Sequence, residues 1–403
     1  MKILAFILLL VSTNLFAQKF ALSDEAEISV ITCGPLQKEL YTAFGHSAFR
    51  VRDPARQFDV AYNYGMFDFD QPNFYLNFAR GYLYYRLGTQ NFRDFVYPYM
   101  YYNRSVREQV LNLTREQKQA IFDYLQVNAL PENQQYRYDY FYDNCATKIR
   151  DVVVEALGKD AVKFDGSYIT TQYTIRDLTD LYLQEQPWGD LGIDICLGLP
   201  MDKTASPYEH MFLPDYIEAG FDHASVRAGE EMLPIVQEKN VIYAARDEHQ
   251  EAGGLPHPLY IFSAFAVLAI MLSLFDLKRR RLSNWFDSLL FGSAGAVGLL
   301  LFFLWFFTDH KAAARNMNLL WAFPGHLIAV VAFLKNPRWL KTYFLSSFIL
   351  CLLLLTTWAL LPQQLHYALV PLVIALGLRS YVQFRVRMFE KAPVQVVRKK
   401  QTA

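Results

Sequence analysis

The segment YDNCATKIRD (residues 142–151) places a cysteine between an Asp-Asn pair and a stretch with helical periodicity. Apolar residues then recur three and four positions apart, at Ile149, Val152, Val153, Ala156 and Leu157. This spacing predicts an amphipathic helix that Gly158 can end, with Asp143 or Asn144 as its N-cap. Cys145 would then lie in the first helical turn, where the helix dipole lowers the pKa of a thiol.

The N-terminus has the features of a secretory signal peptide. MKILAFILLLVSTNLFAQ (residues 1–18) has one Lys, a short apolar run and a small residue, Ala17, before Gln18. The apolar run is too short to span a bilayer. We therefore predict a signal peptide over residues 1–17 and an exported chain from residue 18, with an uncleaved anchor as the alternative.

The C-terminal part of the chain is strongly apolar. Five long apolar segments follow residue 257, at 258–275, 285–307, 319–334, 343–361 and 365–381. Most of them approach the ~20 residues that are needed to cross ~30 Å of hydrocarbon. We predict a transmembrane domain of five helices over residues 258–382, preceded by a polar linker over residues 246–257. Buried helices of a soluble core are the alternative.

Positive charge in the connections predicts the orientation. KRRR (residues 278–281) lies between the first two apolar segments, Lys335, Arg338 and Lys341 lie between the third and fourth, and further Lys and Arg residues fill residues 383–403. The other two connections carry few positive charges. Because Lys and Arg accumulate on the cytoplasmic side, we predict a multi-pass protein of the inner (cytoplasmic) membrane with a periplasmic domain over residues 18–245 and a cytoplasmic tail over residues 383–403.

The pattern of residues 18–245 predicts one α+β domain. Segments 27–34, 46–53 and 58–65 are rich in β-branched and aromatic residues and end in Gly or Asp, as strands do. Residues 114–130 open with the capping-box spacing of Thr114 and Gln117, which indicates a helix. The chain has 39 Lys plus Arg and 39 Asp plus Glu. This balance gives no basic field of the kind that nucleic-acid binding requires.

The cysteine count bears on which thiol is reactive. Cys33, Cys145 and Cys196 are exported, whereas Cys351 lies in the fourth apolar segment. An odd number in an oxidising compartment leaves at least one thiol unpaired within the chain. Pairing of Cys33 with Cys196 would leave Cys145 free. The sequence decides neither this disulfide nor whether Cys145 is a buried, inert thiol instead.

A nucleophilic thiol needs a base, which is usually a histidine. The exported domain offers His46, His210, His223 and His249. In FGHSAFRV (residues 44–51), His46 follows a glycine at the start of a predicted strand, where a rigid scaffold can direct a side chain into a cleft. A half-exposed strand histidine without a chemical role is the alternative, since residues 46 and 145 are far apart in the chain.

Two motifs together resemble a known group of thiol enzymes. GHSAFRV followed by DNCATKI is similar to the circularly permuted papain-like enzymes of the lecithin:retinol acyltransferase group. Longer segments resemble the Lnb family of apolipoprotein N-acyltransferases, namely residues 62–87, 207–216 and 308–324 together with the five apolar segments. The resemblance covers nearly the whole mature chain. It implies a permuted papain-like periplasmic domain with Cys145 as nucleophile, His46 as base, and Asn63 or Tyr62 as the group that orients the imidazole, Asn63 being favoured.

The resemblance also implies the reaction and its partners. Cys145 would take an acyl chain from a membrane phospholipid as a thioester, and the α-amine of a diacylglyceryl-cysteine lipoprotein would accept it as an amide. We expect no metal and no other cofactor, because the sequence contains no metal-ligand spacing and no nucleotide-binding loop.

Five further residues are expected to contact lipid or substrate. Tyr62, Tyr64 and Asn144 adjoin the predicted catalytic residues, and Asp309 and His310 lie in the outer connection between the second and third apolar segments. The aromatic residues of segment 67–85 suit a surface that meets lipid headgroups. An ordinary aromatic core, and a loop pair without a chemical task, are the alternatives.

Two other classes of function fit the same residues. The first is a membrane-anchored cysteine hydrolase, a phospholipase or a cell-wall peptidase, in which water is the acceptor. The second is a non-enzymatic membrane receptor or assembly protein in which Cys145 is structural. An N-acylated product would indicate the acyltransferase, and a hydrolysed product would indicate the hydrolase. The receptor or assembly protein predicts that Cys145→Ala has no effect.

Overall fold

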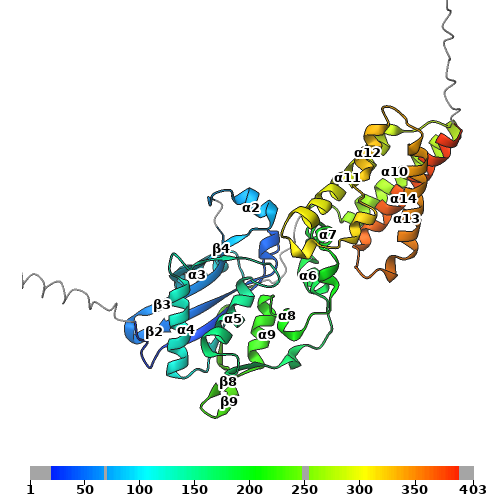
Figure 1. Cartoon of the computed structure of the whole chain (residues 1–403). Helices are drawn as coiled ribbons and strands as arrows, with labels where there is room; N and C mark the ends of the chain where they lie inside the picture. The colour runs from blue at the N-terminus through cyan, green and yellow to red at the C-terminus, as the bar shows by residue number, and fades with distance from the viewer. Residues whose placement is uncertain (1–19, 68–69, 247–253, 390–403) are drawn as a thin grey trace, which may run out of the picture.

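The structure has a sheet-containing N-terminal part and a helical C-terminal part (Figure 1). It is a computed structural model that describes residues 20–67, 70–246 and 254–389. The predicted signal peptide over residues 1–17 lies outside the described residues, as do most of the predicted linker and residues 390–403 of the predicted tail. The mixed α and β character of the first part is confirmed, and the permuted papain-like topology stays a prediction.

An antiparallel sheet forms the centre of the N-terminal part. Within the described residues it has seven strands in the order β10-β5-β1-β2-β3-β4-β6. These strands are β1 (Glu27–Cys33), β2 (His46–Asp53), β3 (Phe58–Met66), β4 (Tyr84–Asn91), β5 (Val106–Leu111), β6 (Gln135–Arg137) and β10 (Val236–Tyr243). The three strands predicted from the sequence are β1, β2 and β3.

The register of β2 and β3 decides which side chains share a face of the sheet. Phe49 pairs with Tyr62, and Arg50 pairs with Ala61. Because side chains alternate along a strand and paired residues point to the same side, His46 and Asn63 fall on one face and Tyr62 on the other.

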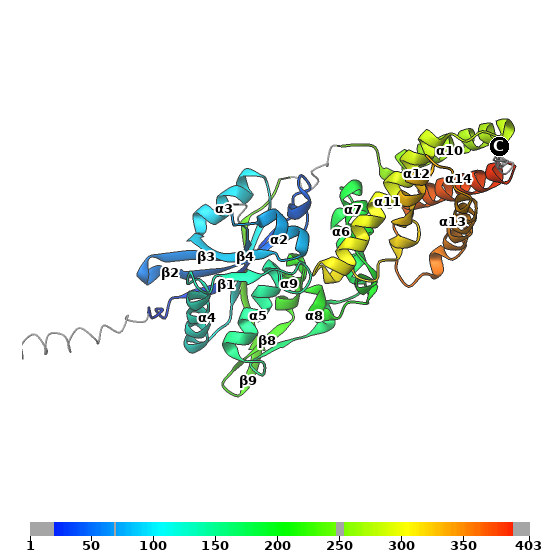
Figure 2. The ribbon, with the colours of Figure 1, turned by 45° about the horizontal axis from the view of Figure 1, so that its top comes forward.

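Helices cover both faces of the sheet (Figure 2). Helices α4 (Arg115–Asn128), α5 (Cys145–Leu157) and α9 (Pro214–Asp222) pack on one face, where Phe49, Tyr62, Phe122, Ile149 and Phe221 belong to the same core. Helix α3 (Phe92–Tyr101) packs on the other face with Phe92 and Phe95. A sheet that is buried on both faces has a strongly specified register, so the strand ends form a rigid frame.

Helix α4 begins as its sequence predicts. The Thr114 hydroxyl accepts a hydrogen bond from the Gln117 backbone N–H at 3.3 Å, and the Gln117 side-chain oxygen accepts one from the Thr114 N–H at 3.0 Å. This reciprocal pair satisfies backbone donors that a helix start leaves free.

The remaining elements of the N-terminal part are short. A second sheet contains β7 (Val162–Phe164), β8 (Ala224–Ala228) and β9 (Glu231–Pro234). Four further helices are α2 (Phe74–Arg80), α6 (Ile175–Leu183), α7 (Pro187–Cys196) and α8 (Pro207–His210). Single 3₁₀ turns are η2 (Leu40–Thr42), η3 (Pro54–Arg56), η4 (Gly166–Tyr168) and η5 (Leu199–Asp202).

The described residues of the C-terminal part form five α-helices of unequal length. They are α10 (Pro258–Arg279), α11 (Asn284–Phe307), α12 (Gly325–Ala332), α13 (Trp339–Thr356) and α14 (Val370–Met388), with 3₁₀ turns η6 (Lys311–Ala313), η7 (Met317–Leu320), η8 (Trp358–Leu360) and η9 (Tyr367–Leu369) between them. In the described chain, four helices are long and apolar enough to cross a membrane, and the stretch Met317–Ala332 is a shorter apolar helix. The prediction of five spanning helices is therefore not confirmed. The third apolar segment breaks before Pro324, whose ring does not fit a helix interior.

A charged cluster is buried among the membrane helices. The Arg379 guanidinium donates to Asp276 at 2.7 Å and to Asp287 at 2.6 and 2.8 Å, and all three side chains are almost fully buried. Gln383 adds a hydrogen bond to Asp287 at 2.6 Å. The cluster joins α10, α11 and α14.

Candidate active site

Cys145 is the first residue of α5, as predicted, and Asn144 is its N-cap. The side-chain oxygen of Asn144 accepts hydrogen bonds from the backbone N–H groups of Ala146 and Thr147, both at 2.9 Å. Its amide nitrogen donates to two backbone carbonyls outside the helix, both at 2.8 Å. Asn144 is buried, and these contacts use both ends of its amide. The residue therefore fixes the start of the helix that carries the thiol.

His46 and Asn63 lie on the adjacent strands β2 and β3 and contact each other. The distance from His46 Nε2 to Asn63 Oδ1 is 2.6 Å. An amide oxygen only accepts, so Nε2 carries the proton and donates. The other ring nitrogen, Nδ1, is left for the Cys145 thiol, with which His46 forms a hydrogen bond. The fold thus brings three predicted residues together from three separate segments.

The protonation states of Cys145 and His46 depend on each other. Burial disfavours the thiolate, but the His46 charge and hydrogen bond and the backbone N–H groups of Ser47 and Ala146 outweigh burial and lower the pKa of Cys145 below 9.0. Burial also disfavours a charged imidazole, but the Cys145 thiolate and hydrogen bonds to Cys145 and Asn63 raise the pKa of His46 above 6.5. Both shifts favour a thiolate–imidazolium pair, which is the reactive form of a cysteine nucleophile.

Gly65 allows β3 and the start of α5 to approach each other. Its φ is +88°, and a Cβ at this position would lie 3.2 Å from Cys145 Cβ. The left-handed backbone and the lack of space both favour glycine. Any larger residue would push against Cys145.

The thiol borders a cavity of about 270 Å³. Cys145, His46 and Gly65 contribute to its wall, and aromatic side chains make up much of the rest, including Tyr41, Phe44, Tyr85, Tyr99, Tyr138 and Tyr140. Tyr85 and Tyr138 stack with their ring centroids 4.1 Å apart. Such walls combine apolar faces with polar edges and suit a ligand that has both apolar and polar parts.

Family models match both parts of the chain. The model of the Lnb N-terminal periplasmic domain matches residues 16–180, and that of the Lnb transmembrane domain matches residues 249–391. The chain belongs to the Lnb family. It is therefore a membrane protein with a periplasmic N-terminal domain. Comparisons with curated proteins and with solved structures gave no match.

Two residues of this Lnb protein that were expected to contact lipid lie in the core. Tyr62 and Tyr64 are 1% and 2% exposed and pack beneath α4 and α5. The Tyr62 hydroxyl accepts a hydrogen bond from Gln126 at 2.5 Å. Both point away from Asn63, because neighbouring residues of a strand face opposite sides of the sheet. Their placement supports neither a lipid contact nor an orienting role for Tyr62 at His46.

The four cysteines, all of which lie in described segments, are free. Cys33 is buried in β1 on the α3 side of the sheet, whereas Cys196 ends α7 and packs against the membrane domain. These places belong to different packing clusters, so the disulfide considered from the sequence does not form. Cys145 is distinguished by its position and not by being left over from a disulfide.

Asp309 and His310 join the two domains of the Lnb protein. The Asp309 carboxylate pairs with Arg137 of β6, and its backbone N–H donates to the Arg80 carbonyl at 2.9 Å. His310 Nε2 is 3.1 Å from the Phe78 carbonyl oxygen. The linings of the two cavities that Cys145, His46 and Asn63 border do not include either side chain. These contacts support a docking role for the pair.

A second set of contacts fixes α7 to the membrane domain. The side-chain amide of Asn316 donates to the Ile195 carbonyl at 2.8 Å, and that of Asn318 donates to the same carbonyl at 3.2 Å. The Gln363 amide donates to the Leu197 carbonyl at 3.0 Å. Two separate connections of the membrane domain therefore bind the same end of α7.

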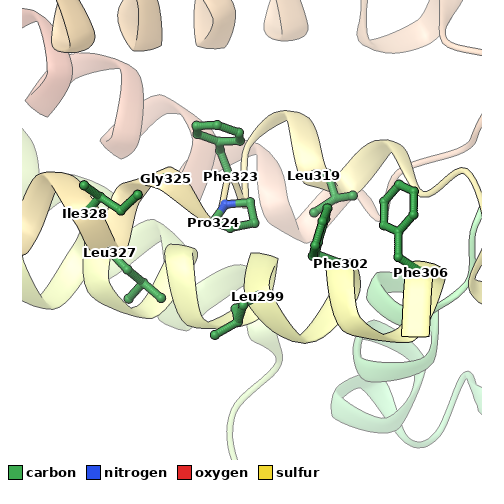
Figure 3. A pocket seen from close by; sticks show the side chains of 9 residues that line it. All are labelled: Leu299, Phe302, Phe306, Leu319, Phe323, Pro324, Gly325, Leu327 and Ile328. Atoms are coloured by element: carbon green, nitrogen blue, oxygen red, sulfur yellow. The ribbon is translucent and has the colours of Figure 1, made fainter. Parts of the chain in front are cut away.

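An apolar groove lies on the membrane domain between α11 and the interrupted third segment (Figure 3). Its volume is about 590 Å³, and its lining residues are Leu299, Phe302, Phe306, Leu319, Phe323, Pro324, Gly325, Leu327 and Ile328. Beside it, a Cβ at Gly298 would clash with the Ala322 carbonyl, so α11 and the third segment pack closely there. The side chains of the groove are all hydrocarbon, as an acyl chain would require.

Sequence reasoning missed three parts of the site. The sequence pattern identifies Gly65 only as the end of a strand. A glycine at this position is itself a signal that another segment packs closely against the backbone. The backbone N–H of Ser47 has no sequence signal beyond following His46. Arg104, which also lines the cavity, is one of 39 Lys and Arg residues and stands in a loop.

Proposed function

We propose that this chain is a lipoprotein N-acyltransferase. It transfers an acyl chain from a membrane phospholipid, through a thioester on Cys145, to the α-amine of a diacylglyceryl-cysteine lipoprotein. The observation that carries the proposal is the hydrogen-bonded series Cys145, His46 and Asn63 beside an aromatic cavity, in a domain joined to membrane helices. Membership of the Lnb family, which is consistent with a lipoprotein-related function, supports the class of acceptor.

In the first half-reaction the Cys145 thiolate attacks an ester carbonyl of the phospholipid. The C–S bond forms, negative charge develops on the carbonyl oxygen, and the N–H groups of Ala146 and Ser47 near the sulfur are available to stabilise it. When the ester C–O bond breaks, the His46 imidazolium gives its proton to the leaving glycerol oxygen. A lysophospholipid leaves, and the acyl chain remains on the enzyme as a thioester.

In the second half-reaction the neutral α-amine of the acceptor attacks the thioester. His46, now uncharged, takes the proton that the amine loses, and Asn63 holds the ring in the tautomer that presents Nδ1. The C–S bond breaks and the free thiolate returns beside an imidazolium. Because an amide is more stable than a thioester, the transfer is effectively one-way.

Features near the membrane domain support a lipid substrate. Helix α2 carries exposed apolar side chains, with Tyr75 78% and Phe78 51% exposed, and it is joined to the end of α11 through Asp309. Aromatic residues of this kind favour the headgroup region. The apolar groove lies on the same helix, α11, and Phe306 at its outer end is close in sequence to Asp309. We propose that the groove holds an acyl chain of the bound lipid.

We also propose five membrane crossings in the inner membrane, with a cytoplasmic C-terminus. Asn316 and Gln363 bind the same end of α7, so the chain between them starts and ends on the periplasmic side. The outward path is α13, whose 18 residues span about 27 Å. An inward path is needed before it, and η7 with α12 is the apolar stretch that precedes α13. This reasoning supports the short third helix as a crossing.

The experiment supplies both substrates at once. Purified protein in detergent receives a phospholipid with a labelled acyl chain and a synthetic diacylglyceryl-cysteine peptide, and mass spectrometry quantifies N-acyl peptide and free fatty acid. We expect N-acyl peptide from the wild type and from Cys196→Ala, which is a matched control, and none from Cys145→Ala. A peptide with a blocked α-amine gives no product. Free fatty acid alone would instead make the protein a hydrolase, and no product of either kind would favour a non-enzymatic role.

A further inference from the structure

Arg104 lies in the loop between α3 and β5, and its side chain lines the thiol cavity. It also lines an adjoining cavity of about 420 Å³ that Asn63 borders. Arg104 Nε donates to the Gly34 carbonyl at 2.8 Å, and the guanidinium carbon is 4.7 Å from the centre of the Tyr99 ring. These two contacts fix the plane of the guanidinium and leave its two terminal nitrogens for the cavity.

The charge of Arg104 has no counter-ion in the described part of the chain. Neither of its terminal nitrogens has a hydrogen-bond partner there, and no carboxylate pairs with it, whereas Arg50, Arg107 and Arg176 each pair with two carboxylates. Its neighbours Cys33 and Tyr99 stay neutral, since burial raises the pKa of Cys33 to about 12 and also that of Tyr99, and the Cys145 thiolate on the same cavity is paired with the His46 imidazolium. A partly buried cation without a counter-ion is a site for an anionic ligand.

The chemistry of the two proposed substrates decides which anion fits. The acceptor brings an α-amine, which a guanidinium repels when the amine is protonated. The phospholipid brings a phosphodiester that is separated from its acyl esters by only part of a glycerol unit. Arg104 and Cys145 border the same cavity, so one lipid molecule can place its ester at the thiol and its phosphate at the guanidinium. The planar fork of arginine matches two phosphate oxygens.

We propose that Arg104 binds the phosphate of the phospholipid acyl donor and thereby positions the ester carbonyl at Cys145. This inference rests on the proposed acyl transfer and deepens it, because it assigns the recognised part of the donor to one side chain. It makes the enzyme selective for glycerophospholipids over uncharged glycerides that carry the same acyl chains.

The first test compares two donors. The rate constant of Cys145 acylation is measured by intact mass with a phosphatidylglycerol and with a diacylglycerol of identical acyl chains, both in the same neutral detergent. We expect Arg104→Gln to lower the rate constant for the phospholipid roughly 10–100-fold, the size of one or two charge-assisted hydrogen bonds, and to leave that for diacylglycerol within about twofold. Arg104→Lys keeps part of the rate, and Arg93→Gln, an exposed position on α3 outside both cavities, is the matched control.

The second test does not depend on turnover. In the Cys145→Ala background, binding of a dialkyl ether phospholipid, which has no ester to cleave, is measured with and without Arg104→Gln. We expect about tenfold weaker binding of the ether phospholipid and unchanged binding of the corresponding dialkylglycerol. Equal losses for charged and uncharged ligands, or no loss in either test, would overturn the assignment. If the wild type binds the ether lipid through Arg104 but forms no thioester, the proposed reaction fails while the phosphate site stands.

Discussion

Two charged clusters of this protein, one fully buried and one partly buried, are built in opposite ways. In the membrane domain, Arg379 is closed in by Asp276 and Asp287, and hydrogen bonds engage its charge from two sides. In the periplasmic domain, Cys145 and His46 form a charged pair that borders a cavity, with the uncompensated Arg104 on the same wall.

The difference indicates what each cluster is for. A buried charge whose partners are all within the protein holds elements together, and removing one partner leaves a costly unpaired charge. A buried charge with unused hydrogen-bonding groups, placed on a cavity, is available to a ligand or a reacting group. The fully buried cluster is also fully paired, whereas the partly buried one keeps unpaired groups on a cavity. The completeness of the pairing therefore separates the structural cluster from the one that we propose to be catalytic.

The largest effect on stability is expected at the cluster of Arg379, Asp276 and Asp287, which we call the closed cluster. Arg379→Met leaves two carboxylates buried without a cation, so the free energy of unfolding should fall by about 3–5 kcal/mol. Thermal unfolding in detergent measures this loss. Arg338→Met, at an exposed position before α13, should change little. Adding Asp276→Asn and Asp287→Asn to Arg379→Met should recover part of the stability. A mild effect of Arg379→Met alone would show that the cluster is not a structural unit.

The next effect is expected at the cluster of Cys145 and His46, which we call the open cluster. It concerns the reaction rate and not the stability of the fold. Asn63→Ala removes the hydrogen bond that orients His46, so kcat should fall roughly 10²-fold with little change in KM. That hydrogen bond also raises the pKa of His46. Without it the imidazolium loses its proton at lower pH, and the alkaline limb of the pH–rate profile for acylation should move to lower pH.

A substitution of similar size at the same position should shift the pH–rate profile in the opposite direction. Asn63→Asp places a negative charge beside the imidazolium, so the alkaline limb should move to higher pH. Gln90→Ala, on the wall of the adjoining cavity, serves as the control and should leave the profile unchanged. An unchanged pH profile in both Asn63 variants would mean that Asn63 does not act through His46.

A smaller effect is expected from two glycines with the same backbone conformation. Gly65 and Gly229 have φ values of +88° and +67°, but a Cβ would meet Cys145 only at Gly65 and nothing at Gly229. Each change to Ala should lower the free energy of unfolding by about 1–2 kcal/mol, because both positions are left-handed. Only Gly65→Ala should also slow the acylation of Cys145. Equal rates in the two variants would argue against a close fit of β3 to the nucleophile.

The smallest effect is expected at a charge pair that lies outside both clusters. Asp309 and Arg137 are partly exposed at the junction of the domains, where water and salt screen the pair. Asp309→Asn should change the free energy of unfolding by less than about 1 kcal/mol, and the change should disappear at high salt. Glu230→Gln, at an exposed position, is the control in the same melting experiment. A large or salt-independent loss would make the junction a second closed cluster.

Local features of the fold could be predicted because local residues determine them. Alternating β-branched and aromatic residues predicted β1, β2 and β3, and the spacing of Thr114 and Gln117 predicted the start of α4. The helix that begins at Cys145 followed from its apolar period and its N-cap, although the sequence did not choose between Asp143 and Asn144.

Features that depend on tertiary contacts could not be predicted in the same way. His46 lies near Cys145 because α5 packs across the sheet. The spacing of residues 46 and 145 in the sequence does not indicate this packing. Arg104 differs from the other arginines of the domain core because no carboxylate of the described chain pairs with it, and this is visible only in the structure. Hydropathy predicted a continuous third span over residues 319–334, but it does not register that Met317–Leu320 form a 3₁₀ turn and that the helix begins only at Gly325.

Intact-mass spectrometry of the purified protein, incubated with phospholipid and no acceptor, tests most directly whether Cys145 is an acyl-accepting nucleophile. We predict a mass increase equal to one acyl chain that neutral hydroxylamine removes, that persists in Cys196→Ala, and that is absent in Cys145→Ala. A folded wild-type protein that gains no acyl mass and releases no fatty acid, or an adduct that survives Cys145→Ala, would contradict the account.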